Sequence, residues 1–85
     1  YPQILKNVRV NTNGEKTAIM ESSALREAIA QAEQTLAGNG RVLIRPSGTE
    51  PLIRVMVEAG EEQTAETVTD ALVKAVENLQ KSIGK

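Results

Sequence analysis

The stretch RVLIRPSGTEPLIRVMVEA, residues 41–59, determines which fold the chain can adopt. Apolar and polar residues alternate on both sides of its middle, which is the period of strands with one buried face. The alternation predicts two strands, at about residues 41–46 and 52–59, framing the connector RPSGTEP at residues 45–51. Because so short a connection suits an antiparallel pair, we expect the two strands to form a hairpin.

The backbone of this connector is consistent with a simple turn. Pro46 lacks an N–H group and has a fixed φ, and Gly48 can adopt conformations that are closed to other residues. Glu50 precedes Pro51 and is therefore biased toward an extended conformation, which leads the chain into the next strand. A structural turn needs no ligand to explain these residues.

The side chains of the connector suggest a second role. The hydroxyls of Ser47 and Thr49, the amides of Gly48 and Thr49, and the guanidinium of Arg45 are the donors that phosphate oxygens accept. A phosphate monoester carries about −1.5 to −2 charges near neutral pH, so convergent donors could hold it without a wider basic surface. On the residues alone, a structural turn and a phosphate site both remain open.

Nearby charged residues each allow two interpretations. Glu50 either accepts a hydrogen bond from a sugar or forms an orienting ion pair with Arg54 or Arg45. We favour the ion pair, because an acid beside a phosphate is repulsive. Arg54 is a candidate for a supporting role in the site, whereas Arg9 and Arg41 are interpreted as surface or interdomain charges.

Before this stretch, the pattern predicts one strand and an ambiguous link. Residues 6–11 alternate, with Val8 and Val10 on one face, as in a half-buried strand. Asn13 and Gly14 indicate a turn. Residues 14–20 are compatible with a short strand, a turn of helix or an irregular link.

Two helices flank the predicted hairpin. Ser22 and Ser23 offer N-cap hydroxyls for the first, and the Gly-Asn-Gly sequence at 38–40 ends it. The second follows Gly60, with Glu61 and Glu62 in its first turn. The expected apolar stripes are Leu25, Ala28, Ile29, Ala32 and Leu36 in the first helix and Ala65, Val68, Leu72, Val76, Leu79 and Ile83 in the second.

This order of elements predicts an α+β domain with a mostly antiparallel sheet and two helices packed on one face. The alternation directs Val42, Ile44, Ile53, Val55 and Val57 toward the helices. The opposite face would carry Leu43, Arg45, Leu52, Arg54, Met56 and Glu58. We expect that mixed face either to be solvated or to lie against another domain.

Composition narrows the possible functions. The chain has 85 residues, a formal net charge of −1, no Cys and no His, which excludes disulfides, thiolate catalysis and imidazole acid–base chemistry. The charge and a single aromatic residue, Tyr1, argue against a nucleic-acid partner. The sequence has no apolar run of about 20 residues, and nothing at its N-terminus resembles a signal peptide, so we expect no membrane partner and a cytoplasmic location. A chain that opens without Met fits a piece of a longer protein.

RPSGTEP at residues 45–51, followed by IRVMVEA at 53–59, closely resembles the C-terminal domain of the α-D-phosphohexomutases, and most of all its bacterial phosphoglucosamine mutase branch. YPQILKNVRV at residues 1–10 is similar to the opening segment of that domain, and residues 38–59 are similar to its centre. The resemblance covers essentially the whole chain. Its connector motif is specific, whereas the helices match only in pattern.

The resemblance implies a binding role within a four-domain enzyme. In this family a phosphoserine in the first domain, with Mg²⁺ held by aspartates in the second, exchanges a phosphoryl group with the substrate. Glucosamine 6-phosphate and glucosamine 1-phosphate would be interconverted through glucosamine 1,6-bisphosphate, on the route to peptidoglycan precursors. The fourth domain, TATA-box-binding-protein-like in fold, closes over the cleft and grips the non-reacting phosphate. The gripping residues implied here are Arg45, Ser47, Gly48 and Thr49.

Two alternatives stay open at this point. The chain could be the same domain of a phosphomannomutase or phosphoglucomutase, or a small α+β regulatory or dimerisation module with a purely structural connector. The Ser-Gly-Thr-Glu-Pro motif favours the glucosamine branch. This chain has no recognisable catalytic serine motif and no aspartate cluster for Mg²⁺, so it would supply no catalytic residue or cofactor itself. The expected partners are sugar phosphates and the other domains of the same enzyme.

Overall fold

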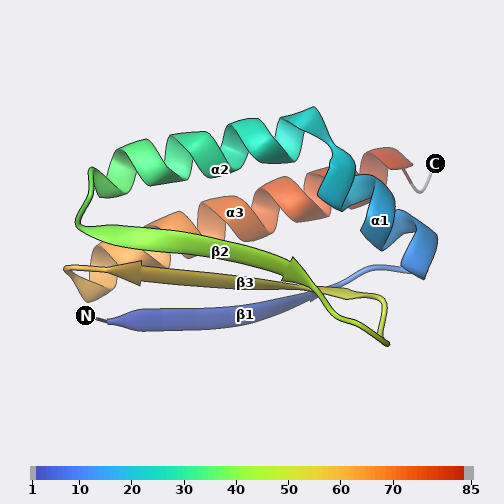
Figure 1. Cartoon of the computed structure of the whole chain (residues 1–85), viewed down its shortest axis with the longest axis horizontal. Helices are drawn as coiled ribbons and strands as arrows, with labels where there is room; N and C mark the ends of the chain where they lie inside the picture. Colours follow the sequence, from blue (N-terminus) through green and yellow to red (C-terminus); the bar gives the residue numbers. More distant parts are fainter. Residues whose placement is uncertain (1, 84–85) are drawn as a thin grey trace.

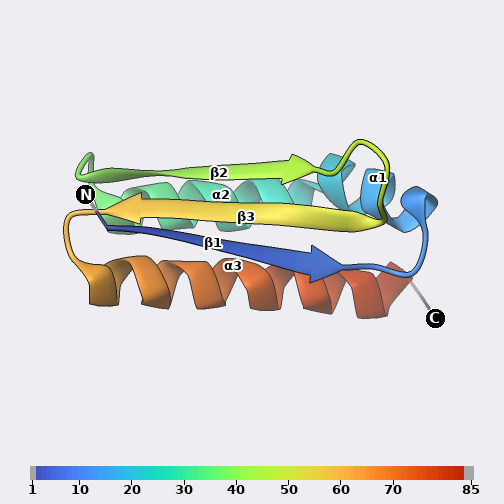
Figure 2. The same cartoon turned by 90° about the horizontal axis from the view of Figure 1, so that it is seen from below.

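Three strands and three helices make up the fold, which is described here from a computed structural model covering residues 2–83. The elements are β1 (Gln3–Arg9), α1 (Asn13–Glu21), α2 (Ser23–Leu36), β2 (Gly40–Pro46), β3 (Leu52–Ala59) and α3 (Glu62–Ile83). The strands form one antiparallel sheet in the order β1-β3-β2, and the helices cover one of its faces (Figures 1 and 2). The predicted α+β class is confirmed, with one helix more than the sequence pattern indicated.

The central strand β3 sets the register of the whole sheet. It pairs with β1 from Gln3↔Glu58 to Arg9↔Leu52 and with β2 from Gly40↔Ala59 to Pro46↔Ile53. Strand β1 therefore begins and ends earlier than the predicted range of 6–11, and Val10 is buried just beyond its end. Every second residue of β3 faces the helices, as the alternation predicted.

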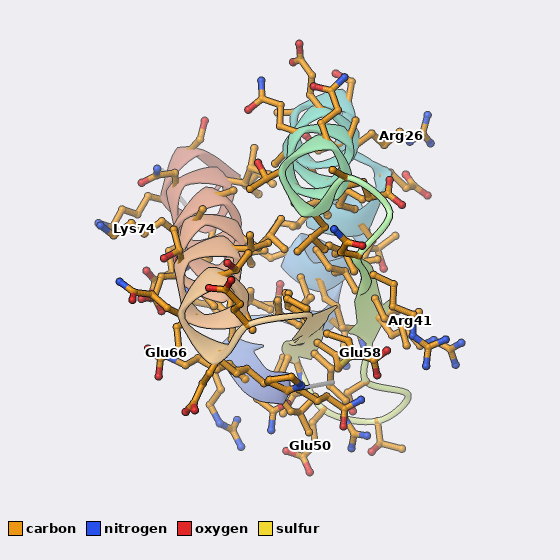
Figure 3. The ribbon with its side chains drawn as sticks, turned by 90° about the vertical axis from the view of Figure 1, so that its left-hand side faces the viewer. Arg26, Arg41, Glu50, Glu58, Glu66 and Lys74 are labelled. Carbon is orange, nitrogen blue, oxygen red and sulfur yellow. The ribbon has the colours of Figure 1, made fainter. Side chains whose placement is uncertain are left out.

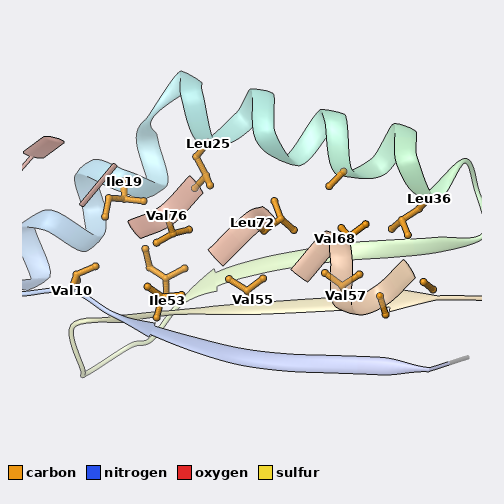
Figure 4. Packing of buried hydrophobic residues seen from close by; sticks show 14 residues of the cluster. Val10, Ile19, Leu25, Leu36, Ile53, Val55, Val57, Val68, Leu72 and Val76 are labelled. Carbon is orange, nitrogen blue, oxygen red and sulfur yellow. The ribbon is translucent and has the colours of Figure 1, made fainter. Parts of the chain in front are cut away.

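The core lies between β3 and the three helices. The side chains of Ile53, Val55 and Val57 are fully buried, and Figure 4 shows them on the helix side of β3, below the labelled residues of α3: Val76, Leu72 and Val68. Burying an aliphatic side chain of this size stabilises the fold by about 1.5 to 3 kcal/mol. The predicted helix stripes are buried or partly buried in this core, with Ile83 as the exception: it is 39% exposed.

Helix α1 occupies the segment that the sequence left ambiguous, and the predicted turn at Asn13 and Gly14 is wrong. Both residues belong to the first turn of α1, because Thr12 caps it. The Thr12 hydroxyl accepts a hydrogen bond from the Glu15 amide at 3.1 Å, and the Glu15 carboxylate accepts one from the Asn11 amide at 3.2 Å. These two capping bonds stabilise the helix start enough to outweigh the low helix propensity of glycine.

Ser22 links helices α1 and α2 and caps both of them. Its amide donates to the Ile19 carbonyl at the end of α1, and its hydroxyl accepts from the Ala24 amide at the start of α2. The predicted N-cap at Ser22 is therefore confirmed. Helix α2 ends in left-handed conformations at Ala37 (φ 50°) and Gly38 (φ 81°), where the predicted glycine stop lies. None of the helices within residues 2–83 has the length and apolarity needed to cross a membrane.

We predict that Gly40→Ala destabilises the chain by about 3 kcal/mol, the upper end of typical overpacking costs. A Cβ atom at this position would lie 2.0 Å from the backbone oxygen of Glu58, so β2 and β3 would have to separate. Urea unfolding followed by circular dichroism measures the change.

Gly14→Ala is the matched control for this substitution. Its added Cβ would meet only the Thr12 hydroxyl at 3.7 Å, so stability should hold or rise slightly. Equal unfolding midpoints for the two variants would contradict the close approach of the strands at Gly40.

Candidate functional site

The connector between β2 and β3 projects from one end of the sheet toward the face that the helices leave uncovered. Figure 1 shows this yellow-green segment dipping below the sheet, and Figure 3 shows Glu50 on the side away from the helices. Gly48, Thr49 and Glu50 are exposed, and Ser47 is half-buried. The predicted site residues of the connector are therefore open to a ligand.

Backbone hydrogen bonds close the connector into a defined turn. The Ser47 amide donates to the Leu52 carbonyl at 2.9 Å, and the Leu52 amide donates to the Glu50 carbonyl at 2.8 Å. The Glu50 amide donates to the Ser47 hydroxyl oxygen at 3.3 Å. Because that hydroxyl serves as an acceptor here, its own proton remains available to a ligand.

The tip of the turn offers donors that have no partner in the part of the chain that the structure describes. Within residues 2–83, the amides of Gly48 and Thr49 donate to no protein acceptor. A Cβ atom added at Gly48 would meet no heavy atom within 4 Å, and the φ of Gly48 is not positive. The turn therefore closes without using the wider conformational range that glycine allows at this position.

Arg45 and Arg54 lie directly opposite one another on neighbouring strands beside this turn. Both are exposed, and they share the lining of a groove of about 250 Å³ with Leu5, Leu43 and Met56. Among the described residues neither arginine forms an ion pair. Like charges directly across a ladder destabilise a sheet, so this pair favours the approach of an anion.

The partner of Glu50 differs from the prediction. Its carboxylate pairs with Arg9 at 3.1 Å, not with Arg45 or Arg54, and both side chains are more than half exposed. The reason is the sheet register, which places the end of β1 beside the start of β3, where the connector ends. Arg9 is thus exposed, as interpreted, but it also holds the connector, whereas Arg41 is a surface charge near Glu58 at 3.9 Å (Figure 3).

Leu52 lies on the predicted face of β3 but is more buried than the other residues of that face. The register places it on the uncovered face of β3, but it is only 8% exposed and lies outside the main core cluster. Its amide and carbonyl both bond to the connector, so it anchors the turn at the end of the central strand. The remaining predicted members of this face, from Leu43 to Glu58, follow the alternation.

One residue near the site was missed by sequence reasoning. Lys16 of α1 is 8% exposed, and its ammonium donates to the carbonyls of Ser47 and Glu50. Its spacing in the sequence could have indicated that it is buried, because Lys16 lies one turn before the fully buried Ile19 on the same helix face. That spacing could not be used while residues 14–20 had no assigned structure.

The described part of the chain does not offer a metal centre. Within residues 2–83, no group of three or more His, Cys, Asp or Glu side chains comes together in a way that could hold a metal ion. The chemistry available at the connector is therefore that of hydrogen-bond donors and guanidinium groups.

Comparison with known proteins agrees with the sequence motif. Residues 5–75 match the family described as the C-terminal domain of phosphoglucomutase/phosphomannomutase. The chain is 48% identical over 77 residues to a phosphoglucosamine mutase of Lactococcus lactis subsp. cremoris (strain SK11), and the match covers 91% of this chain and 17% of that protein. A phosphoglucosamine mutase of Rhizobium meliloti (strain 1021) is 52% identical over 75 residues, which are 88% of this chain and 16% of that protein.

The fold has a counterpart of known structure. The crystal structure of Aspergillus fumigatus N-acetylphosphoglucosamine mutase in complex with GlcNAc-6P and magnesium matches with a TM-score of 0.75 and 25% identity. The match covers 93% of this chain and 16% of that one. The chain thus spans about one sixth of the length of the relatives that it matches.

We predict that Arg45→Gln raises the free energy of unfolding of the ligand-free chain by about 0.5 kcal/mol at low salt, because it removes the repulsion from Arg54. The gain should shrink as salt screens the charges. Urea unfolding at two salt concentrations measures it.

Arg41→Gln provides the matched control. It removes a guanidinium from the same strand and face, but one whose cross-strand neighbour is the oppositely charged Glu58. This variant should be equally stable or slightly less stable than the parent chain. If Arg45→Gln were no more stable than Arg41→Gln, the arginine pair would not be repulsive.

Proposed function

The chain belongs to the family of phosphoglucomutase/phosphomannomutase C-terminal domains, and from this premise we propose that its connector binds the non-reacting phosphate of a sugar phosphate. The proposed substrates are glucosamine 6-phosphate, glucosamine 1-phosphate and their bisphosphate, within a longer phosphoglucosamine mutase. The proposed ligands of the phosphate are Arg45, Ser47, Gly48 and Thr49, and Arg54 supports them.

The observation that carries this proposal is the set of unpaired donors on one side of the chain. Arg45 and Arg54 face each other without a carboxylate partner among residues 2–83, and the amides of Gly48 and Thr49 lie in the adjoining turn. A dianionic phosphate would neutralise the two guanidinium groups and accept hydrogen bonds from the amides and the hydroxyls. An exposed turn with a purely structural role would have no need for this combination.

The expected affinity of the isolated chain is modest. Hydrogen bonds to a charged group contribute on the order of 1.5 to 3 kcal/mol each, and the association itself costs several kcal/mol. Three or four such bonds at an exposed turn correspond to a dissociation constant on the order of millimolar. The remaining surface of the sugar phosphate would be buried by the rest of the longer protein.

A phosphate clamp suits the demands of a mutase. Phosphoryl transfer depends chiefly on positioning and on charge stabilisation, so a group bound far from the reacting atoms can accelerate the reaction. The bisphosphate intermediate must also be bound in two opposite orientations. A turn that recognises a phosphate, rather than the sugar carbon that carries it, serves both orientations equally.

In this proposal, the transferred phosphoryl group and the metal ion are bound by other parts of the longer protein. The related Aspergillus fumigatus enzyme was crystallised with GlcNAc-6P and magnesium. The described residues of the present chain do not fit a Mg²⁺ site, because their acidic side chains do not cluster. The ion and the catalytic phosphoserine would therefore come from parts of the longer protein outside this chain, and no step proposed here passes through them.

We predict that glucosamine 6-phosphate at millimolar concentration shifts the backbone amide signals of Gly48 and Thr49 in the 85-residue chain. These amides have no protein acceptor in the described structure, so a bound phosphate should change their shielding directly. A ¹H–¹⁵N titration measures the shifts and the dissociation constant. Glucosamine without phosphate is the control ligand and should leave both signals in place.

The proposed site would be refuted if ten-millimolar sugar phosphate shifted no amide signal at residues 45–49 while the chain stayed folded. Shifts of equal size at Gly60, on the opposite end of the sheet, would also count against it, since they would indicate a general effect of added salt.

We predict that Arg45→Ala in the full-length mutase lowers kcat/KM by roughly 10- to 1000-fold, which corresponds to about 1.4 to 4 kcal/mol of lost transition-state stabilisation. The change removes the only guanidinium on β2 at the site end of the strand. Steady-state kinetics measure it. Arg41→Ala, at the other end of the same strand, should retain at least half of the parent kcat/KM, and equal effects of the two substitutions would argue against a clamp at Arg45.

A further inference from the structure

Lys16 is the most unusual buried residue in the described chain. It lies in the first half of α1 and is only 8% exposed, although lysine is rarely buried without a partner. Within residues 2–83 it forms no ion pair with a carboxylate. Instead, its ammonium donates to two backbone carbonyls of the connector, those of Ser47 and Glu50, the latter at 3.2 Å.

The bond to Ser47 determines which way the next amide points. The chain contains no cis peptide among the described residues, so the Ser47 carbonyl and the Gly48 N–H point in opposite directions across one planar unit. With the carbonyl held by a buried ammonium, the Gly48 N–H is directed away from Lys16. The lysine thereby orients one of the donors that the proposed phosphate site uses.

The bond to Glu50 has a different consequence. The following residue is Pro51, which has no N–H, so this carbonyl orients no donor. It fixes the far end of the turn, where the Leu52 amide donates to the same oxygen at 2.8 Å. One ammonium therefore holds both ends of the Ser47–Gly48–Thr49–Glu50 turn at once.

The charge of Lys16 acts in the same direction as its hydrogen bonds. A positive charge next to two carbonyl oxygens strengthens these bonds and polarises the peptide units that contain them. Because no carboxylate among residues 2–83 pairs with the ammonium, its field adds to that of Arg45 and Arg54 at the connector. A preformed turn also lowers the cost of ordering when a ligand binds.

We propose that Lys16 is a positioning residue for phosphate binding, which fixes the connector from beneath so that the Gly48 amide faces the ligand. This inference rests on the proposed function of the connector. Lys16 itself need not touch the phosphate, and its role is exerted through the carbonyls of Ser47 and Glu50.

The test compares Lys16→Met with Lys6→Met in the ¹⁵N-labelled 85-residue chain, titrated with inorganic phosphate and with glucosamine 6-phosphate. Methionine keeps an unbranched side chain of similar length but removes the charge and the donor. Lys6 is the matched control, because it is half-exposed and pairs with Asp70 on the α3 side of the sheet. Both variants lose one positive charge.

For Lys16→Met we expect two results that a merely structural lysine would not give. Without ligand, amide shifts should change at residues 47–50 and the Gly48 amide should exchange faster with water. With ligand, the dissociation constant of the folded protein should rise about tenfold. Lys6→Met should change neither. Unaltered affinity in folded Lys16→Met, or equal losses in both variants, would overturn the inference.

A measurement on the parent chain keeps the inference testable if Lys16→Met does not fold. The Lys16 ammonium should exchange its protons with water more slowly than that of Lys6, and its ¹⁵N signal should shift when phosphate is added. Exchange as fast as that of Lys6 would overturn the inference. If the parent chain binds no phosphate at all, the proposed function itself fails, and that outcome is distinct from a failure confined to Lys16.

Discussion

The burial of one face of β3 is the constraint on which the rest of the structure depends. This strand is hydrogen-bonded on both sides, and Ile53, Val55 and Val57 are completely shielded from water by the helices. A shift of one residue along β3 would exchange these side chains for Arg54, Met56 and Glu58, at a cost of several kcal/mol. The register is therefore fixed by the core, and the positions of all residues on the uncovered face follow from it.

The same register concentrates the unfavourable features of the fold in one place. Along most of β2 and β3 the cross-strand partners suit one another, as with Arg41 and Glu58. At the connector, Arg45 faces Arg54, and the amides beyond them are unpaired within the described chain. The aliphatic core can tolerate a repulsion of a fraction of a kcal/mol, and a local violation of pairing rules within a consistent fold is typical of a functional site.

Helix α1 connects the core to this site. Ile19 is fully buried in the core, and one turn earlier on the same helix Lys16 contacts the carbonyls of the connector. Because both residues lie on one short, capped helix, the packing of Ile19 also determines where the Lys16 ammonium lies. Removing a lysine from water is unfavourable, and the two carbonyl bonds offset part of that cost. The connector is thus supported from inside the protein, although its tip is exposed.

The sequence by itself determined the local elements and the chemistry of the connector. Alternation at 41–46 and 52–59, the cap at Ser22 and the glycine stop after α2 depend on residues close together in the chain, so their pattern is visible in one dimension. The donors of Ser47 and Thr49 are likewise properties of the residues themselves. The same reasoning could have predicted helix α1, because Thr12 and Glu15 have the spacing of a helix N-cap. The Asn-Gly pair between them, however, indicated a turn.

Only the tertiary structure decided how these parts meet. It set the strand order β1-β3-β2, gave Glu50 the partner Arg9 from 41 residues earlier, and brought Lys16 to a carbonyl 31 residues away. Such contacts depend on how whole elements pack, and local periodicity carries no information about which distant residues that packing brings together. The sequence therefore supplied the donors of the connector, whereas the fold decided which charges surround them and which way the turn is held.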